Sequence, residues 1–392
     1  MNVKIASFWL FVAALVFPGF HGAWAQSILT AVPIVYLYDV ETKSVLFEKG
    51  ADDLFAPASI IKLLTAETVF HALKQGQVTV ETEYPISENT WRRGGAPSGG
   101  AAMFALLNSR VAISDLLQGL LVMSANDAAL ALAEGISGSE AEFLKRMQAR
   151  AAALGLVRSQ FRNATGFSHP EQRVTAREMA KLAGHIIQTY PEYYAIFGQR
   201  EFTWNKIRQL NRNPLLTMNI GADGMKTGNI AEAGFGLVGS AVQNDRRLIL
   251  VVLGADTALT RSAEAKKLME WGFRNFERRK LFEKGAMLAE ASVTGGTSAS
   301  VTLGVREDID LLMPKSSLDT VTTKITYFGP VKAPVVVGAE LGRLVVNRGT
   351  TIALDVPVVA LSTVPEGSLR KRALDNSWEW VSGMFRRGGS KT

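Results

Sequence analysis

The hydrophobic pattern of the chain changes near Phe282, and this change limits the fold more than any other feature of the sequence. Before it, strand-like runs alternate with helical patterns; after it, short Val-, Thr- and Ile-rich runs alternate with glycine and proline. A mixture of helices and strands is typical of an α/β layer domain, whereas closely spaced short strands are typical of a small β-sandwich or barrel. The sequence therefore predicts two domains of different class.

The first domain is predicted to have a largely antiparallel sheet, with helices inserted between an early hairpin and later strands. The hairpin is expected over residues 32–38 and 45–47, and the later strands over 236–242 and 248–254. Residues with helical periodicity lie between them and after them, at 57–73, 113–132, 141–154, 175–189 and 263–276. Short strands of the second domain are expected over residues 300–303, 309–312, 320–327, 335–337, 344–346 and 352–359.

The N-terminus has the layout of a cleavable secretory signal. Lys4 precedes an apolar run over residues 8–17, and Ala23-Trp24-Ala25 supplies small residues where a signal peptidase reads them. The run is shorter than the ~20 residues that span a bilayer, so we expect cleavage after Ala25 rather than an uncleaved anchor. The expected boundaries are a signal peptide at 1–25, an α/β catalytic domain at 26–280, a β-rich domain at 281–365 and a tail at 366–392.

Composition excludes several classes of function. The chain has no cysteine, which rules out disulfides, a thiolate nucleophile and a lipid anchor on cysteine. Of the net charge of +7, +4 comes from six cations and two anions in the last 25 residues, so a nucleic-acid partner is not expected for the body of the protein. Its four histidines show no metal-ligand spacing and favour neither a Ser-His-Asp triad nor a metal site.

Three short motifs carry the chemistry: Ser59-Ile60-Ile61-Lys62, Ser124-Ala125-Asn126 and Lys226-Thr227-Gly228. Each is weak alone, but together and in this order they form the set found in penicillin-binding proteins and class A β-lactamases. Residues three apart on a helix share one face, so Lys62 can reach the Ser59 hydroxyl. Lysine can act as a base only when burial or a nearby cation such as Lys226 depresses its pKa.

The remaining motif residues have expected roles in binding and proton transfer. Ser124 can pass the proton to the leaving amine, and Asn126 can hold the substrate amide and orient Lys62. Lys226 and Thr227 favour a terminal carboxylate, and Gly228 lets a peptide approach the backbone closely. The Ser59 backbone N–H can stabilise a developing oxyanion.

Several longer stretches resemble the low-molecular-mass D-alanyl-D-alanine carboxypeptidases: residues 56–62, 91–104 (WRRGGAPSGGAAMF), 124–128, 163–166 (NATG), 201–203, 211–213 and 224–228. The resemblance implies a catalytic domain of the serine β-lactamase/transpeptidase type, a β-rich stalk and a membrane-surface anchor. It also implies that Ser59 is the acylated nucleophile and Lys62 its base, that Arg212 and Arg247 hold the terminal carboxylate, and that no cofactor is needed.

The sequence departs from the family pattern at two positions. Asn229 follows Lys-Thr-Gly where histidine is common, and Ala125 replaces the usual glycine of Ser-x-Asn. The expected oxyanion contact at position 229 uses the backbone N–H, which asparagine retains. We therefore expect acylation to survive, and the effect of the Asn229 side chain on substrate preference is left open.

The expected activity is hydrolysis of the D-Ala-D-Ala bond in peptidoglycan stem peptides, with β-lactams as covalent inhibitors. A serine β-lactamase is one alternative, although the sequence lacks the Glu-x-x-Leu-Asn element of class A enzymes. A weakly catalytic penicillin-binding scaffold is another, and endopeptidase or transpeptidase activity is left open. The secretory signal predicts a periplasmic enzyme.

The tail predicts how such an enzyme attaches to the inner membrane. Leu374, Trp378, Val381 and Phe385 fall on one helical face, and arginines and lysines flank it at both ends. The stretch is too short and too charged to span a bilayer, and its pattern is that of an interfacial helix. A helix docked on the β-rich domain is the alternative interpretation.

Overall fold

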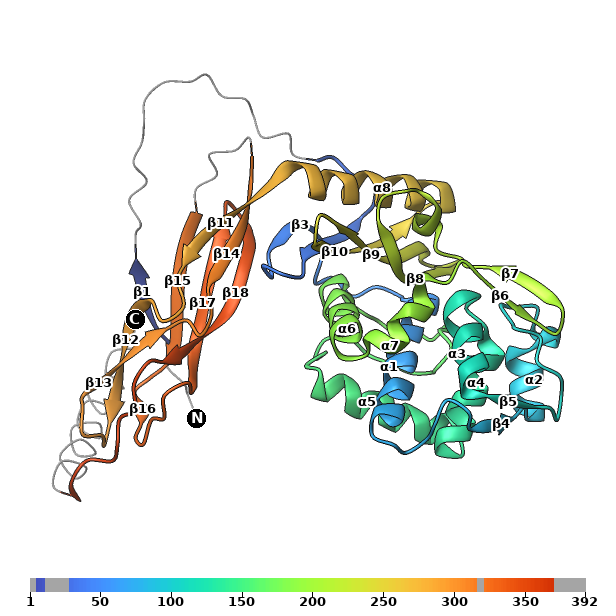
Figure 1. Ribbon diagram of the computed structural model, residues 1–392, viewed down its shortest axis with the longest axis horizontal. Helices are drawn as coiled ribbons and strands as arrows, with labels where there is room; N and C mark the ends of the chain where they lie inside the picture. The colour runs from blue at the N-terminus through green and yellow to red at the C-terminus, as the bar shows by residue number, and fades with distance from the viewer. Residues whose placement is uncertain (1–4, 11–27, 316–320, 370–392) are drawn as a thin grey trace, which may run out of the picture. The chain divides into compact units, whose positions relative to one another are not determined.

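The computed structural model describes residues 5–10, 28–315 and 321–369, which divide into two compact units (Figure 1). The α/β unit contains the described residues of 26–41 and 46–274. The β unit contains residues 42–45 together with the described residues of 1–25 and 275–392. The division between the units along the chain therefore falls at Arg274, six residues before the predicted boundary.

The α/β unit is built on a five-stranded sheet with the order β3-β2-β10-β9-β8. Antiparallel ladders join β8 to β9, β9 to β10 and β10 to β2. Of the three interior strands, β9 and β10 each contain six consecutive buried residues, which explains why they read as continuous apolar runs. The strands are β2 (Ile34–Asp39), β3 (Val45–Lys49), β8 (Ala222–Ile230), β9 (Gly234–Gln243) and β10 (Arg246–Ala255).

Helices cover both faces of this sheet (Figure 1). On one face α8 (Ala258–Asn275) packs so closely that a Cβ on Gly272 would lie 2.8 Å from side-chain atoms of Leu248 and Leu37. The other face carries the helical block, in which α6 contacts β10 and β2. The block comprises α1 (Lys62–Lys74), α2 (Glu88–Gly94), α3 (Ile113–Val122), α4 (Asn126–Ser137), α5 (Glu140–Ala153), α6 (Ala176–Thr189) and α7 (Pro191–Tyr194).

The helix α1 lies inside this block, since all of its residues except His71 and Lys74 are buried. A short 3-10 turn, η1 (Ala58–Ile61), leads directly into it. Three further 3-10 turns and two small hairpins complete the unit: η2 (Ala96–Ser98), η3 (Ala195–Gly198), η4 (Pro214–Thr217), β4 (Glu83–Pro85) with β5 (Arg110–Ala112), and β6 (Glu201–Trp204) with β7 (Ile207–Leu210).

The β unit has a seven-stranded sheet with the order β1-β15-β17-β18-β13-β12-β16 and a separate pair, β11 with β14. Its core is aliphatic and includes Leu303, Leu311, Leu344 and Val358, all of them fully buried or nearly so. The strands are β1 (Ile5–Leu10), β11 (Phe276–Phe282), β12 (Met287–Thr294), β13 (Ser300–Gly304), β14 (Ile309–Pro314), β15 (Val321–Phe328), β16 (Val331–Lys332), β17 (Glu340–Arg348) and β18 (Thr351–Ala360).

The two chain ends bear on the targeting predictions in different ways. Residues 5–10 of the predicted signal form β1, which pairs antiparallel with β15, and cleavage after Ala25 stays a prediction. The predicted tail helix, from Leu374 to Phe385, lies outside the described residues. Within the described part of the chain, no helix has the length and apolar character needed to cross a membrane.

Three local predictions differ from the structure. Lys226-Thr227-Gly228 lies within the strand β8 rather than ahead of the first returning strand. That segment was missed because aspartate, glycine and lysine are all depleted in strands. The stretch 335–337 forms no strand but an isolated bridge between Val335 and Val364, and Phe276 begins β11 instead of ending a helix.

Candidate active site

A cleft of about 620 Å³ opens in the α/β unit where η1, the α3–α4 connection and the edge strand β8 meet. Seven of the ten predicted site residues line it, and Lys62 and Lys226 are buried with no more than 1% of their surface exposed. The lining residues are Ser59, Gly100, Ala101, Ser124, Asn126, Gly166, Phe167, Ser168, Arg212, Thr227, Gly228, Asn229, Ile230, Phe235 and Arg261.

The η1 turn brings Ser59 and Lys62 together, as their spacing predicts. The Lys62 ammonium or amine nitrogen Nζ lies 3.0 Å from Ser59 Oγ and 2.7 Å from Asn126 Oδ1. A third contact joins Lys62 Nζ to the backbone carbonyl of Thr165. Lys62 therefore has three oxygen partners, and only Ser59 among them is a potential nucleophile.

Two glycines let the neighbouring chain segments come close to η1. A Cβ at Gly228 would lie 2.7 Å from the Pro57 carbonyl oxygen, so any larger residue would push β8 away from Ser59. On the other side, Gly166 has a φ of +90°, and a Cβ there would collide with the Ala58 carbonyl. The Lys-Thr-Gly and Asn-Ala-Thr-Gly motifs thus each contain a glycine required by this packing.

The Ser124-Ala125-Asn126 motif forms the connection between α3 and α4. Ser124 has a left-handed backbone with a φ of +64°, and its buried Oγ has no hydrogen-bond partner among the described residues. The next acidic residue, Asp127, accepts hydrogen bonds from the backbone N–H groups of Met103 and Ala105. Asp127 thereby fixes the 100–105 loop, which forms one wall of the cleft.

The electrostatics of the cleft depress the pKa of both lysines. Burial holds the pKa of Lys62 well below its usual value, and the positive charges of Lys226 and Arg212 lower it further. Burial, with Arg212 and Arg261, lowers the pKa of Lys226 to about 7. The site therefore combines an excess of cations with a lysine that readily gives up its proton.

The guanidinium groups at the cleft belong to Arg212 and Arg261. Arg261 is buried whereas Arg212 is more exposed, and partial desolvation lowers the pKa of each from its ordinary value. Together with Thr227 they line the same cavity, in an arrangement suited to a carboxylate.

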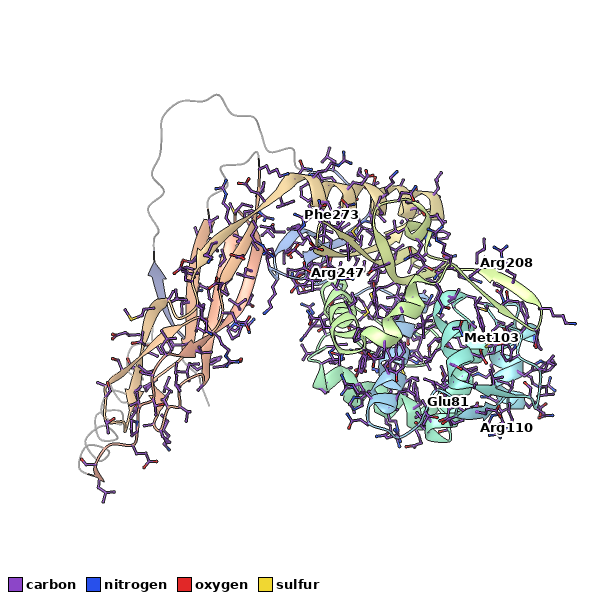
Figure 2. All side chains as sticks on the ribbon, in the orientation of Figure 1. Glu81, Met103, Arg110, Arg208, Arg247 and Phe273 are labelled. Atoms are coloured by element: carbon purple, nitrogen blue, oxygen red, sulfur yellow. The ribbon has the colours of Figure 1, made fainter. Side chains whose placement is uncertain are left out.

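Arg247 does not belong to this group, contrary to what the family resemblance implies. Its guanidinium forms an ion pair of 2.8 Å with Asp223 and donates to Ser240 Oγ. The guanidinium of Arg247, labelled in Figure 2, lies over the Tyr194 ring, and Arg247 is not among the residues that line the cleft. Arg261, in the first turns of α8, is the second cleft arginine instead.

Comparison with known proteins agrees with this geometry. The family model described as D-alanyl-D-alanine carboxypeptidase matches residues 27–257. The model described as penicillin-binding protein 5, C-terminal domain, matches residues 276–366. The chain belongs to the D-alanyl-D-alanine carboxypeptidase family.

Relatives match over most of their length. D-alanyl-D-alanine carboxypeptidase DacA of Haemophilus influenzae is 36% identical over 356 residues, 89% of each chain. DacC of Escherichia coli K12 is 36% identical over 352 residues, 89% of this chain and 87% of that one. The crystal structure of penicillin binding protein 5 from Haemophilus influenzae superposes with a TM-score of 0.72 at 35% identity, covering 87% of this chain and 99% of that one.

These findings confirm the predicted fold class, a serine β-lactamase/transpeptidase-like catalytic domain followed by an all-β domain. Sequence reasoning missed two contributors to the site. The Thr165 carbonyl lay inside a recognised motif but was assigned no role, and Arg261 has no distinguishing sequence context. In the described part of the chain, no cluster of histidine, aspartate or glutamate could hold a metal ion.

Proposed function

We propose that this enzyme removes the terminal D-alanine from peptidoglycan stem peptides through an acyl-enzyme on Ser59. The observation that carries the proposal is the contact of 3.0 Å between Ser59 Oγ and the Nζ of Lys62, which is fully buried. Serine needs an adjacent base to become a nucleophile, and a lysine with a depressed pKa provides one.

Burial and the neighbouring cations favour a neutral amine at Lys62, and its oxygen partners leave the lone pair facing Ser59. A neutral amine has two N–H groups, and the Asn126 Oδ1 atom and the Thr165 carbonyl can accept both. The lone pair then remains for the Ser59 O–H. On attack, Lys62 takes the proton while Ser59 Oγ forms a bond to the carbonyl carbon of the penultimate D-alanine.

The tetrahedral intermediate places a negative charge on the former carbonyl oxygen. We assign the backbone N–H groups of Ser59 and Asn229, one on each side of the cleft, as its donors. The surplus of positive charge from Lys226, Arg212 and Arg261 supports the same state. Asn229 serves as well as histidine in this step, because only its backbone takes part.

Ser124 completes the first half-reaction. Its unpartnered, buried Oγ is suited to relay the proton from Lys62 to the leaving nitrogen as the C–N bond breaks. D-alanine leaves with its carboxylate near Thr227, Arg212 and Arg261. Water then hydrolyses the ester, which returns the proton to Ser59 and releases the shortened peptide.

The lining of the cleft separates this proposal from a class A β-lactamase mechanism. None of the lining residues is an aspartate or glutamate, so no carboxylate faces the acyl-enzyme to activate water. A β-lactam ring that opens on Ser59 is therefore expected to give a slowly hydrolysed adduct. A penicillin-binding scaffold without turnover is disfavoured because Lys62, Ser124 and Asn126 are all in place.

The test uses a stem pentapeptide ending in D-Ala-D-Ala. We expect release of one D-alanine per peptide, and mass spectrometry should locate a penicilloyl group on the peptide containing Ser59 after incubation with benzylpenicillin. Ser59→Ala should abolish both. Labelling at another residue, or D-alanine release by Ser59→Ala, would overturn the assignment.

We also propose a periplasmic location at the outer face of the inner membrane, based on the N-terminal signal pattern and the amphipathic tail. Truncation after Pro365 should leave the protein in the soluble fraction with full activity on small peptides. Membrane sedimentation of the truncated protein would contradict the anchor, as would a full-length protein that never sediments.

A further inference from the structure

The Thr165 carbonyl accepts an N–H of Lys62 and so fixes the direction of that N–H. Residues that position this carbonyl therefore also position the Lys62 amine. It belongs to the loop formed by Asn163-Ala164-Thr165-Gly166. Within the loop, Asn163 Oδ1 accepts the backbone N–H groups of Thr165 and Gly166 at 3.3 and 2.7 Å. These bonds shape the turn, but they do not tie it to the rest of the unit.

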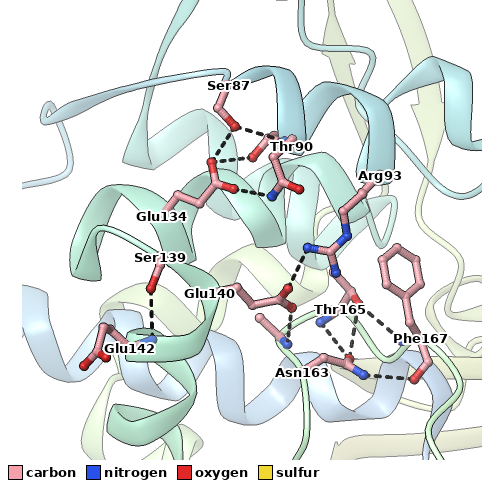
Figure 3. A network of polar contacts seen from close by, with 12 residues as sticks. Ser87, Thr90, Arg93, Glu134, Ser139, Glu140, Glu142, Asn163, Thr165 and Phe167 are labelled. Atoms are coloured by element: carbon pink, nitrogen blue, oxygen red, sulfur yellow. Dashed lines mark hydrogen bonds and ion pairs between the residues drawn. The ribbon is translucent and has the colours of Figure 1, made fainter.

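Glu140 ties the loop to the helical block. Its Oε1 accepts the backbone N–H of Ala164 at 3.1 Å, and its Oε2 accepts from Arg93 Nη1 at 2.9 Å. Figure 3 shows Glu140 between Arg93 and the loop that carries Asn163 and Thr165. The side chain of Glu140 is only 17% exposed, so it is well placed to hold one geometry.

Arg93 is itself held in place through its helix. Glu134 on α4 accepts hydrogen bonds from Ser87 Oγ and Thr90 Oγ1, at 2.5 and 3.0 Å, and so docks α2 against α4 (Figure 3). A continuous series of contacts therefore links α4 to the Asn163–Gly166 loop, through α2, Arg93 and Glu140.

We propose that Glu140 is a positioning residue for the reaction, held by Arg93: by accepting the Ala164 N–H it fixes the Asn163–Gly166 loop, so that the Thr165 carbonyl accepts an N–H of Lys62. This inference rests on the proposed role of Lys62 as the base. The geometry gives Glu140 no contact with the cleft, since it is absent from the lining, so it acts only through the loop. Displacing a catalytic group by ~1 Å costs about 100-fold in rate.

Other hydrogen bonds also hold the loop, so we expect the fold to stay intact when Glu140 is replaced. Thr65 Oγ1 donates to the Ala164 carbonyl at 2.8 Å, and Gln148 on α5 donates to the Phe161 carbonyl at 3.4 Å. The Arg93–Glu140 ion pair is partly exposed, with Arg93 44% accessible, and such pairs add little to stability. Variants at Glu140 should therefore change the reaction more than the melting temperature.

Two substitutions separate the hydrogen bond from the charge. Glu140→Ala removes both, whereas Glu140→Gln removes the charge but keeps an oxygen for the Ala164 N–H. Arg92→Gln is the matched control, because Arg92 lies beside Arg93 on α2 but, among the described residues, pairs with Glu88 rather than with Glu140. The readout is the rate of Ser59 acylation by benzylpenicillin from pH 5 to pH 10, measured on the full chain.

We expect Glu140→Ala to lower the plateau acylation rate about 10- to 100-fold. Its acid limb should also move to lower pH, because a lost carbonyl contact no longer favours the protonated form of Lys62. Lys226, Arg212 and Asp127, which also act on that proton, are unchanged in this variant. The acylation rate of Glu140→Gln should fall by less than about 5-fold, and the acylation rate of Arg92→Gln should match that of the parent.

Equal effects of Glu140→Ala and Glu140→Gln would show a charge effect and overturn the positioning role. So would a Glu140→Ala protein that acylates like the parent with an unchanged pH profile. Either result would leave the proposed function standing, provided that the parent still acylates Ser59 and Lys62→Arg does not. Loss of labelling at Ser59 in the parent would instead contradict the proposed function itself.

Discussion

The interiors of the two units hold different kinds of residue. In the described part of the β unit, the buried polar residues are Thr42, Ser44 and Arg348, and the rest of the core is apolar. Arg348 donates to the carbonyls of Leu312 and Val45, and its guanidinium stacks on the Phe276 ring. Arg348 is thus a buried cation with hydrogen-bond acceptors and an aromatic ring around its charge, and its role is structural.

In the α/β unit, the buried lysines of the cleft lie in surroundings that disfavour their protonated form. Lys62 and Lys226 are buried beside each other and near Arg212, an arrangement that lowers the pKa of both lysines. Burial of a charge is costly unless it is paired, so such groups persist where chemistry requires them. Burial alone therefore does not identify a site; the sign of the buried charge and whether it has compensating partners do.

The largest effect is expected for Lys62→Arg, which keeps a cation at the site but cannot release its proton near neutral pH. General base catalysis contributes about 100- to 10,000-fold, and we expect a loss in the upper part of that range. Acylation of Ser59 followed by mass spectrometry measures it. Near-normal acylation by Lys62→Arg would show that another group is the base. Lys62 would then be a structural buried cation, as Arg348 is.

A substitution in the β-unit core should instead lower the stability of the protein and leave its activity unchanged. Leu344 is fully buried in it, so Leu344→Ala should lower the free energy of unfolding by about 2–5 kcal/mol. Activity on a small D-Ala-D-Ala peptide should be unchanged under conditions where the protein stays folded. Thermal unfolding and kcat/KM on one preparation test both statements, and a parallel loss of kcat/KM would tie the β unit to the chemistry.

A smaller effect distinguishes the two arginines that were candidates for carboxylate binding. Arg261→Gln should raise KM about 10-fold, because a charge-assisted hydrogen bond to the substrate is lost. Arg247→Gln should leave KM within about two-fold, since its partners are Asp223 and Ser240 rather than cleft residues. The reverse order of KM values would restore Arg247 as the carboxylate residue.

The smallest effect concerns Lys226, whose pKa is lowered to about 7. Its positive charge is present below that pH and is lost above it, so KM for a carboxylate-ended peptide should rise a few-fold between pH 6 and pH 8. Arg212 and Arg261 keep their charge and limit the change. A peptide amide lacking the carboxylate is the control, and an equal rise in its KM would exclude this explanation.

The parts of the site that follow from local spacing could be predicted from the sequence. Ser59 and Lys62 are three residues apart on one turn, so their contact needs no knowledge of the fold. Arg261 and the Thr165 carbonyl reach the site only through tertiary packing, and a backbone carbonyl leaves no residue-type signal. Arg247 was wrongly placed because its strand position resembles a site arginine, while its side chain pairs with Asp223.

The fold shows the same division between local and long-range information. The apolar interior strands could be recognised as continuous apolar runs, and α1 as an apolar helical stretch that follows Pro57. The strand β8 did not, because its Lys226, Gly224 and Gly228 are chosen for the cleft and for close packing rather than for strand propensity. The element that carries the site was therefore the hardest to recognise.

The pH dependence of Ser59 acylation by benzylpenicillin tests the central claim, that Lys62 is a neutral base at neutral pH, most directly. Because burial and neighbouring cations hold the pKa of Lys62 well below its usual value, the rate should already be on its plateau near neutral pH and should fall only on further acidification. A rate that instead climbs steadily up to about pH 10, as for a lysine with an ordinary pKa, would contradict the account.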